Sequence, residues 1–176
     1  MQASDLMSYP AITCSASGPL SNAARLMWEN DCGVLPVIDE GGRLIGMVTD
    51  RDICMAAYIQ GSQLDAIETR TAMAANVLAC RPDDSVESIE RLMKNGQVRR
   101  IPVIDDDHRP VGVVSMNDLA RHAAEGGRTQ VNREVVATLA TISEPRNGRS
   151  GAHAESEPVR VPSAGTTPTA EQHIAH

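Results

Sequence analysis

The sequence predicts an α/β protein in which two tandem βαββα repeats pack sheet to sheet about a pseudo-twofold axis. Three observations predict this fold class. The chain matches itself at an offset of 66 residues, each copy alternates short aliphatic runs with helical patterns, and one copy of roughly 55 residues buries too little surface to be stable alone. The two copies are therefore expected to share a core, with a ligand cleft between them.

The self-match covers most of the first half of the chain. It runs without a gap from Met7 to Ala57, and conservative replacements fill many positions between the identical ones. The identical pairs include Met7 and Met73, Cys14 and Cys80, Pro36 and Pro102, Gly46 and Gly112, and Asp52 and Asp118. Two halves that share this pattern should fold alike.

The hydrophobic periodicity predicts the same elements in each half. In the first half, an extended segment over 11–14 precedes an amphipathic helix over 19–30. Two aliphatic strands over 34–38 and 44–48 are joined by a turn that contains Gly-Gly, and a second helix follows over 49–58. The equivalent segments of the second half are 77–80, 85–94, 100–104, 111–114 and 117–124.

These segments divide the chain into five parts. We expect a first repeat over 1–61, a linker over 62–70, a second repeat over 71–124, a C-terminal amphipathic helix over 125–143 and a disordered tail over 144–176. An apolar stripe predicts the C-terminal helix, and it comprises Val131, Val135, Val136, Leu139 and Ile142. The helix is expected to dock on the repeats or on a second subunit. The tail is rich in Pro, Gly, Ser, Thr and Ala, and it lacks the apolar surface that would offset its ordering entropy.

Charge and hydropathy argue against two classes of partner. The formal net charge is −7, and Arg99-Arg100 is the only compact basic pair in the part that is expected to fold, whereas binding to nucleic acid needs clustered Lys and Arg. No apolar run approaches the roughly 20 residues that span a bilayer, and the start of the chain lacks the layout of a signal peptide. We therefore expect a cytoplasmic protein with no nucleic-acid partner and no membrane insertion.

The residue types that carry catalysis or bind metals are scattered. The four Cys residues contain no C-x-x-C pair, and the five His residues show no ligand spacing. Asp105-Asp106-Asp107 lies in a predicted hairpin turn, where consecutive carboxylates point in different directions. No Ser-His-Asp constellation or glycine-rich phosphate loop is present, so the sequence predicts no enzyme, no metal site and no required cofactor.

One motif follows the second strand of each half. A hydroxyl residue is followed three positions later by an Asp, first as Thr49 and Asp52 and again as Ser115 and Asp118. At the head of a helix this spacing is close to a capping box, in which the two side chains satisfy the helix's own N–H groups. The same groups suit a nucleotide, because a hydroxyl and helix N–H groups bind phosphate and a carboxylate accepts from both ribose hydroxyls. The two roles can alternate between empty and occupied states.

Together with the strands before it, this motif resembles the signature of the cystathionine-beta-synthase-type (CBS) domain family. The resemblance is carried by Leu35–Asp39 with Gly46–Asp52 and by Ile101–Asp105 with Gly112 and Asp118. Paired CBS repeats form a Bateman module that commonly binds AMP, ADP, ATP or S-adenosylmethionine in its cleft. The resemblance therefore implies an adenosine nucleotide as a regulatory ligand, with Thr49 or Ser115 on the phosphate and Asp52 or Asp118 on the ribose.

The resemblance also implies which residues line the adenine slot. They are Ile12, Cys14, Val34 and Leu35 in the first half and Leu78, Cys80, Arg100 and Ile101 in the second. Because Val34 and Arg100 occupy equivalent positions, the two sites are expected to differ, and Arg99 or Arg100 could reach a phosphate.

Two functions are consistent with these features. In the first, a bound adenosine nucleotide shifts the relative placement of the repeats, and an unidentified regulated protein responds to the shifted surface. In the second, the module is a ligand-free dimerisation or scaffold unit in which Asp52 and Asp118 only cap helices. The resemblance implies, in addition, a homodimer that assembles through its helices.

Overall fold

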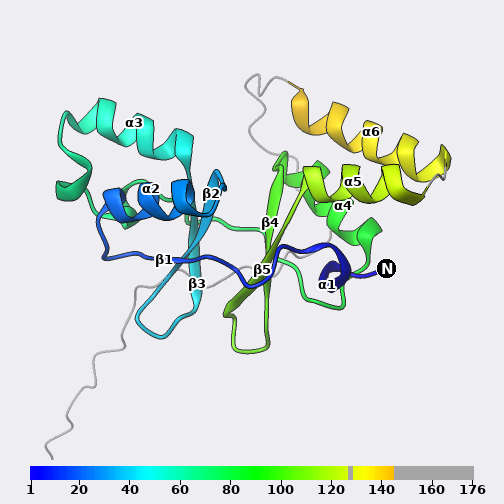
Figure 1. Cartoon of the computed structure of the whole chain (residues 1–176), viewed down its shortest axis with the longest axis horizontal. Coiled ribbons are helices and arrows are strands. Elements are labelled where there is room, and N and C mark those ends of the chain that lie inside the picture. The colour runs from blue at the N-terminus through cyan, green and yellow to red at the C-terminus, as the bar shows by residue number, and fades with distance from the viewer. Residues whose placement is uncertain (127–128, 145–176) are drawn as a thin grey trace, which may run out of the picture.

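The computed structural model describes residues 1–126 and 129–144, with the side chains of 125–132 left undescribed. Figure 1 shows two α/β halves side by side, with their hairpins adjacent and their helices on the outside. The first half contains β1 (Cys14–Ser15), α2 (Leu20–Glu29), β2 (Val34–Ile38), β3 (Leu44–Thr49) and α3 (Asp50–Gln60). The second half contains α4 (Val86–Gly96), β4 (Arg100–Ile104), β5 (Pro110–Ser115) and α5 (Met116–Gly126). The predicted tandem βαββα architecture is confirmed.

Short elements lie at the N-terminus and in the connection between the halves, and a longer helix ends the described part of the chain. A helix of four residues, α1 (Ala3–Leu6), begins the chain, and two 3-10 turns, η1 (Leu64–Ala66) and η2 (Thr69–Thr71), lie between the repeats. The last described helix is α6 (Thr129–Ser143). Most of the tail expected over 144–176 lies outside the described residues.

The two sheets have related but unequal topologies. In the first, β1 pairs parallel to β2 and β2 pairs antiparallel to β3. In the second, β4 pairs antiparallel to β5, and the counterpart of β1 is a single parallel bridge between Cys80 and Val103. Leu44, Val77, Ala79 and Ile104 form a small buried cluster between the halves. The main chain also joins them, because the amide of Leu44 donates to the carbonyl of His108 at 2.9 Å.

Each half of the fold contains a segment that lies outside the sequence range expected for its repeat. α1 packs in the core of the second half, and the amide of Ala3 donates to the carbonyl of Asp84 at 2.9 Å. The segment before α4 makes the matching exchange, because Met47 and Ala74 pair as an antiparallel bridge on the first sheet. Each half is therefore completed by residues that precede the other half in sequence, which ties the two together.

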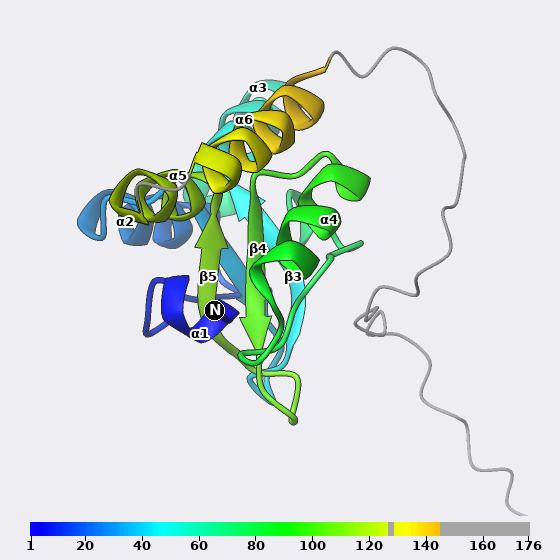
Figure 2. The same ribbon diagram turned by 90° about the vertical axis from the view of Figure 1, so that its right-hand side faces the viewer.

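The C-terminal helix buries a narrower face than its sequence stripe predicts. Within α6, Val135 and Ile142 are buried against the second half, whereas Val136 and Leu139 remain exposed. Thr138 takes a buried position between them, because its hydroxyl is satisfied by the carbonyl of Glu134 at 2.9 Å. Figure 2 shows α6 lying beside both α4 and α5, which are its packing partners.

Candidate functional site

A cleft of about 290 Å³ lies where the two halves meet at the N-terminus of α5. The loop after α2 forms one wall, and β5 with the first turns of α5 forms the other. Main-chain N–H groups in the first turn of a helix have no carbonyl partner inside the helix and attract anions. The cleft is lined by Ser8, Pro10, Ala11, Ile12, Asn30, Asp31, Cys32, Gly33, Val34, Arg100, Val113, Ser115, Asn117, Asp118 and Arg121.

Ser115 and Asp118 form a closed hydrogen-bonded unit in this cleft. The amide and the hydroxyl of Ser115 donate to Oδ2 of Asp118 at 2.8 and 2.6 Å, and the amide of Asp118 donates to the Ser115 hydroxyl at 3.3 Å. This is the geometry of a capping box, so the helix-capping role of the motif is present in the structure.

Asp118 is engaged on its other oxygen as well. The Arg121 guanidinium, one turn further along α5, donates to Oδ1 of Asp118 and forms an ion pair with it. The aspartate is 6% exposed, whereas the side chain of Arg121 is largely in solvent. Because the guanidinium lies at the surface, water can solvate it when it leaves Asp118. A ligand hydroxyl that reaches Oδ1 can therefore take the place of Arg121, so that this oxygen of the buried carboxylate keeps a hydrogen-bond donor.

The equivalent pair in the first half has the same cap but different surroundings. The amide and hydroxyl of Thr49 donate to Oδ2 of Asp52 at 2.9 and 2.7 Å. Met55 occupies the position equivalent to Arg121, and among the described residues Asp52 forms no ion pair. Neither Thr49 nor Asp52 lines the cleft described above.

The structure brings together five of the twelve site residues expected from the sequence. Ile12, Val34, Arg100, Ser115 and Asp118 line one cleft. Four others have buried side chains that face the core, and these are Cys14, Leu35, Cys80 and Ile101. Leu78 packs under α4, where a Cβ at Gly96 would lie 2.4 Å from its Cδ1. These five side chains do not line the cleft, so any contact they make with a ligand there has to come from the main chain.

Several lining residues were not expected from the sequence. The loop Asn30–Gly33 follows α2 and directly precedes Val34, which is a predicted site residue. This position in the sequence could have indicated that the loop lines the cleft. Arg121 lies three residues after Asp118 on the same helix, which puts the two on one face. The self-match could not predict the contribution of Ser8 to Ala11, because it does not show which half of the fold the N-terminal segment contacts.

Arg100 reaches across from the second half to the wall formed by the first. A Cβ added at Gly33 would lie 3.6 Å from Nη2 of Arg100 and 3.0 Å from Oδ2 of Asp50. The guanidinium of Arg100 therefore lies next to Gly33, and the absence of a side chain at Gly33 leaves room for it beside the cleft. Arg100 and Arg121 are the two cations among the lining residues, and Asp31 and Asp118 are the two anions.

The two cysteines that the sequence places in the adenine slot are buried thiols with raised pKa values. Burial raises the pKa of Cys14 to about 11, and burial together with the charge of Asp84 raises the pKa of Cys80 to about 12. Within residues 1–126 and 129–144, no group of three or more His, Cys, Asp or Glu side chains is arranged to hold a metal ion. No helix in the same part of the chain is long and apolar enough to cross a membrane.

Two βαββα repeats that enclose a cleft beside a helix N-terminus define a paired-repeat α/β module. The family model for the CBS domain matches residues 3–58 and 67–125, so the chain belongs to the CBS domain family.

A mycobacterial protein is similar over most of this chain. Hypoxic response protein 1 of Mycobacterium tuberculosis is 31% identical over 141 residues, which cover 80% of this chain and 98% of that protein. The crystal structure of this response protein, solved with two coordinated zinc ions, has a TM-score of 0.63 at 33% identity and covers 69% of this chain and 98% of that one.

Other similarities bear on ligand binding and on enzymatic activity. The CBS domain pair of protein MJ0100, solved in complex with 5'-methylthioadenosine and S-adenosyl-L-methionine, has a TM-score of 0.64 at 28% identity and covers 72% of this chain and 98% of that one. Homoserine O-acetyltransferase of Methanosalsum zhilinae is 29% identical over 66% of this chain, which corresponds to only 23% of that enzyme. The likeness to the acetyltransferase is therefore confined to a CBS-matching portion and brings no catalytic activity to this chain.

Proposed function

We propose that this chain is a regulatory CBS pair that binds an adenosine nucleotide in the cleft at the N-terminus of α5. One observation carries the proposal: Ser115 and Asp118 at the start of α5, together with Arg100 of β4, line a single cleft with the loop Asn30–Gly33 of the first repeat. A nucleotide there contacts both halves, so its binding energy can depend on how the halves are placed.

Each part of the cleft matches a part of the ligand. The buried Asp118 carboxylate, held from one side by Ser115, accepts hydrogen bonds from the ribose hydroxyls through its Oδ1. The first turn of α5 and the Arg100 guanidinium favour a phosphate or another anionic group. Ile12 and Val34 supply apolar surface for the adenine, and the Asn30–Gly33 loop, which lines the same cleft, offers main-chain groups for hydrogen bonds to its edge.

Similarity to a ligand-bound relative supports the same ligand class. The MJ0100 pair binds two adenosine compounds, 5'-methylthioadenosine and S-adenosyl-L-methionine. The shared element is the adenosine group, and our proposal for this chain rests on that group. A regulated partner protein and a homodimeric state belong to the proposal, and the cytoplasmic location inferred from the sequence stays a prediction.

A second candidate function is a ligand-free dimerisation or scaffold module. The observation that favours it is that both Asp side chains already cap their helices, so the motif has a structural role without any ligand. The two functions differ in what the loss of Asp118 does. A cap contributes about 0.5–2 kcal/mol to stability, whereas loss of a ribose contact removes binding.

The test is a thermal-unfolding screen of the full chain with AMP, ADP, ATP, S-adenosylmethionine and 5'-methylthioadenosine, followed by calorimetric titration of any ligand that shifts the melt. A ligand at 100 times its Kd should stabilise the protein by about 2.7 kcal/mol. Asp118→Ala should abolish that shift. Asp52→Ala, the equivalent substitution outside this cleft, should lower the melting temperature by a similar amount through its lost cap and keep the ligand response.

The outcomes separate the two functions. A ligand shift that Asp118→Ala removes and Asp52→Ala retains supports the sensor and its site. If no adenosine compound shifts the melt at millimolar concentration, and both variants lose only the stability of a cap, the scaffold function replaces it.

A further inference from the structure

The cleft at the N-terminus of α5 holds one ion pair and one further carboxylate. Arg121 and Asp118 form the pair, and both belong to the second repeat. Asp31, in the loop that follows α2 of the first repeat, lines the same cleft. Among the described residues, the Asp31 carboxylate accepts no hydrogen bond and forms no ion pair. A second anion therefore lines the cleft from the opposite repeat.

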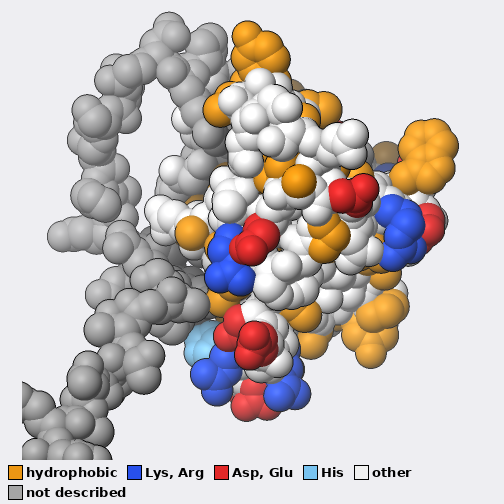
Figure 3. All heavy atoms as spheres, turned by 90° about the vertical axis from the view of Figure 1, so that its left-hand side faces the viewer, with side chains coloured by type: hydrophobic (Ala, Val, Ile, Leu, Met, Phe, Trp, Pro, Cys, Tyr) orange, Lys and Arg blue, Asp and Glu red, His pale blue; other side chains and the backbone are white. Residues whose placement is uncertain are grey.

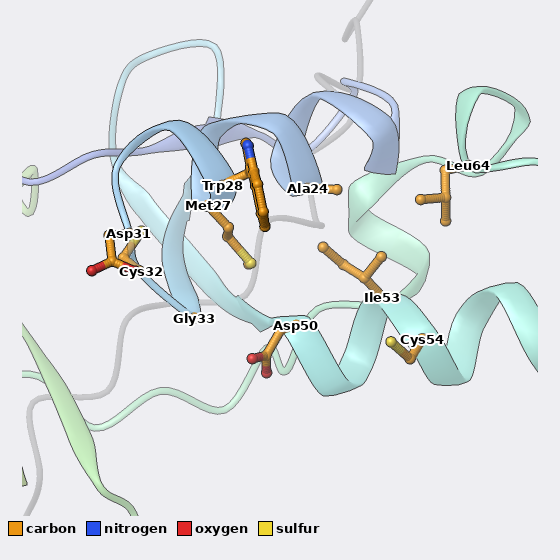
Figure 4. Close-up of a pocket in the computed structure, with 10 residues that line it drawn as sticks. All are labelled: Ala24, Met27, Trp28, Asp31, Cys32, Gly33, Asp50, Ile53, Cys54 and Leu64. Atoms are coloured by element: carbon orange, nitrogen blue, oxygen red, sulfur yellow. The ribbon is translucent and has the colours of Figure 1, made fainter.

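The loop after α2 fixes the position of Asp31. The φ angle of this residue is 48°, in the left-handed region that Asp and Asn adopt more readily than most residues. The amide of Cys32 donates to a carbonyl of α2 at 3.0 Å, and the carbonyl of Gly33 accepts from the first amide of α3 at 3.3 Å. Figure 4 shows the Asp31 carboxylate pointing away from Ile53 of α3. The main chain thus holds this carboxylate at the edge of the cleft.

Both charges are missing from the equivalent positions of the other repeat. At the repeat offset of 66, Gln97 corresponds to Asp31 and Met55 corresponds to Arg121. The backbone supports the first correspondence, because φ is 47° at Gln97 and 48° at Asp31. One loop and helix that face each other across the repeats therefore carry both charges, and the equivalent loop and helix carry neither. Two opposite charges that occur together and are replaced together are expected to act on each other.

The cation that can serve Asp31 has to come from the cleft. Figure 3 views the outer side of the first repeat and shows Lys and Arg side chains beside Asp and Glu side chains. On α2, Arg25 is already paired with Glu29 at 2.6 Å. The cations that share the cleft with Asp31 are Arg100 and Arg121. In the proposed function Arg100 binds an anionic group of the ligand, so Arg121 is the cation that a ribose releases.

We propose that Arg121 and Asp31 form a latch between the repeats, which closes when a ribose hydroxyl takes the place of Arg121 on Asp118. The inference rests on the proposed function, because the ligand is what releases the guanidinium. An ion pair within the second repeat is thereby exchanged for one that joins both repeats. A ligand shifts the placement of the repeats only if the bound state has interactions that the empty state lacks. The latch is such an interaction.

A direct contact of Asp31 with the ligand is the main rival, since a carboxylate also accepts hydrogen bonds from an adenine amino group. The two cases differ in their dependence on Arg121. A direct contact contributes to binding whether or not Arg121 is present, whereas the latch contributes only when it is. Arg121→Met is the matched replacement, because the first repeat has Met55 at the equivalent position.

The first experiment is a double-mutant cycle on ligand binding, measured by calorimetric titration with 5'-methylthioadenosine. This probe has the ribose and lacks a phosphate, so it offers Arg100 no anionic group. At low salt, Asp31→Asn should weaken binding about two- to fivefold, as expected for a partly exposed ion pair, and high salt should reduce the loss. In the Arg121→Met background, Asp31→Asn should have no further effect. Glu29→Gln should keep the affinity, because Glu29 is an exposed carboxylate that does not line the cleft.

A second cycle tests the latch without a ligand. Asp118→Asn keeps an oxygen that accepts from Ser115, but it removes the charge that holds Arg121, so it takes the part of the ribose. In this background, Asp31→Asn should lower the equilibrium constant for folding by about two- to fivefold. In the unmodified chain, the same substitution should leave that constant nearly unchanged. Denaturant unfolding of the full chain measures both effects.

The outcomes decide between the latch and its rival. A loss of affinity in Asp31→Asn that persists in the Arg121→Met background would overturn the latch in favour of a direct contact. Equal effects of Asp31→Asn on folding with and without Asp118→Asn would overturn it as well, because the released guanidinium would then have no preference for Asp31. If no adenosine compound binds, the proposed function fails, and the folding cycle alone decides whether Arg121 can reach Asp31.

Discussion

Met7 packs so closely on Gly112 that a Cβ on the glycine would lie 2.5 Å from the methionine Sδ and 3.0 Å from the carbonyl oxygen of Ser8. Met73 packs on Gly46 in the same way, with a hypothetical Cβ 2.5 Å from Sδ and 3.1 Å from the carbonyl oxygen of Ala74. The four residues form two equivalent pairs at the repeat offset of 66. Each pair joins one sheet to the segment that precedes the other repeat, so these contacts hold the exchange of segments in place.

We expect Gly112→Ala to destabilise the protein by about 1–3 kcal/mol, as overpacking of a tight contact does. The methionine side chain can move, but the Ser8 carbonyl belongs to a main-chain bridge between Ser8 and Val113 and cannot move independently. Denaturant unfolding measures the effect. Combining Gly112→Ala with Met7→Ala should cost less than the sum of the two single changes.

The control for this substitution is Gly41→Ala in an exposed hairpin turn. Its nearest neighbour is the side-chain Oδ1 of Asp39 at 3.3 Å, and a change there should stay within about 0.5 kcal/mol. Equal losses for Gly41→Ala and Gly112→Ala would show that the close approach of Met7 does not constrain the fold.

The sequence predicted the parts of the fold that repeat locally. The strands over 34–38 and 100–104 have the bounds that the aliphatic runs indicate, because β-branched residues between turn signals specify a buried strand well. The hydroxyl-to-Asp pairs were also expected, since their spacing places both residues on one turn. Helix capping and ligand binding use the same groups, so the sequence could not separate the two roles.

The contacts between segments that lie far apart in the sequence could not be predicted from it. A self-match shows that two segments are alike but not which half each one contacts, so the docking of α1 on the second repeat could not be predicted. The stripe on α6 was predicted too wide, because Thr138 can bury its hydroxyl on the Glu134 carbonyl and displace Leu139 to the rim. Equivalent residues that differ, such as Met55 and Arg121, could be assigned different roles only after the cleft beside Asp118 was located.

The buried carboxyl of Glu90 on α4 should make the stability of the second repeat depend on pH. Burial raises the pKa of Glu90, Lys94 opposes that rise, and Glu134 of α6 and Glu87 add to it. With a raised pKa in the folded state, stability should fall as pH increases through the interval between the ordinary value and the raised one. Glu90→Gln removes the cost of burying a charge, so it should raise the melting temperature at neutral pH and converge with the unmodified chain in acid.

Glu87 on the same helix provides a control of opposite sign. Hydrogen bonds with the main chain in the first turn and with Ser85 lower its pKa, so its contribution is present at neutral pH and lost in acid. Glu87→Gln should therefore lower the melting temperature slightly at neutral pH. Melting curves of both variants across the pH range test the pair, and a change of the same sign in both would contradict the assignment of Glu90.

Arg100 should determine whether the cleft prefers a phosphorylated ligand. It is the cation that approaches the cleft from β4 without a paired carboxylate among the described ion pairs, whereas Arg121 is held by Asp118. A charge-assisted hydrogen bond contributes about 1.5–3 kcal/mol. Arg100→Ala should thus weaken the binding of AMP or ATP by about 10- to 100-fold and leave the binding of 5'-methylthioadenosine, which has no phosphate, nearly unchanged.

Arg99→Ala is the matched control, since Arg99 is the adjacent cation and does not line the cleft. Calorimetric titrations at two salt concentrations measure the difference, which should shrink in high salt as the charge is screened. Equal losses for the phosphorylated and unphosphorylated ligands would mean that Arg100 shapes the wall beside Gly33 and does not bind phosphate.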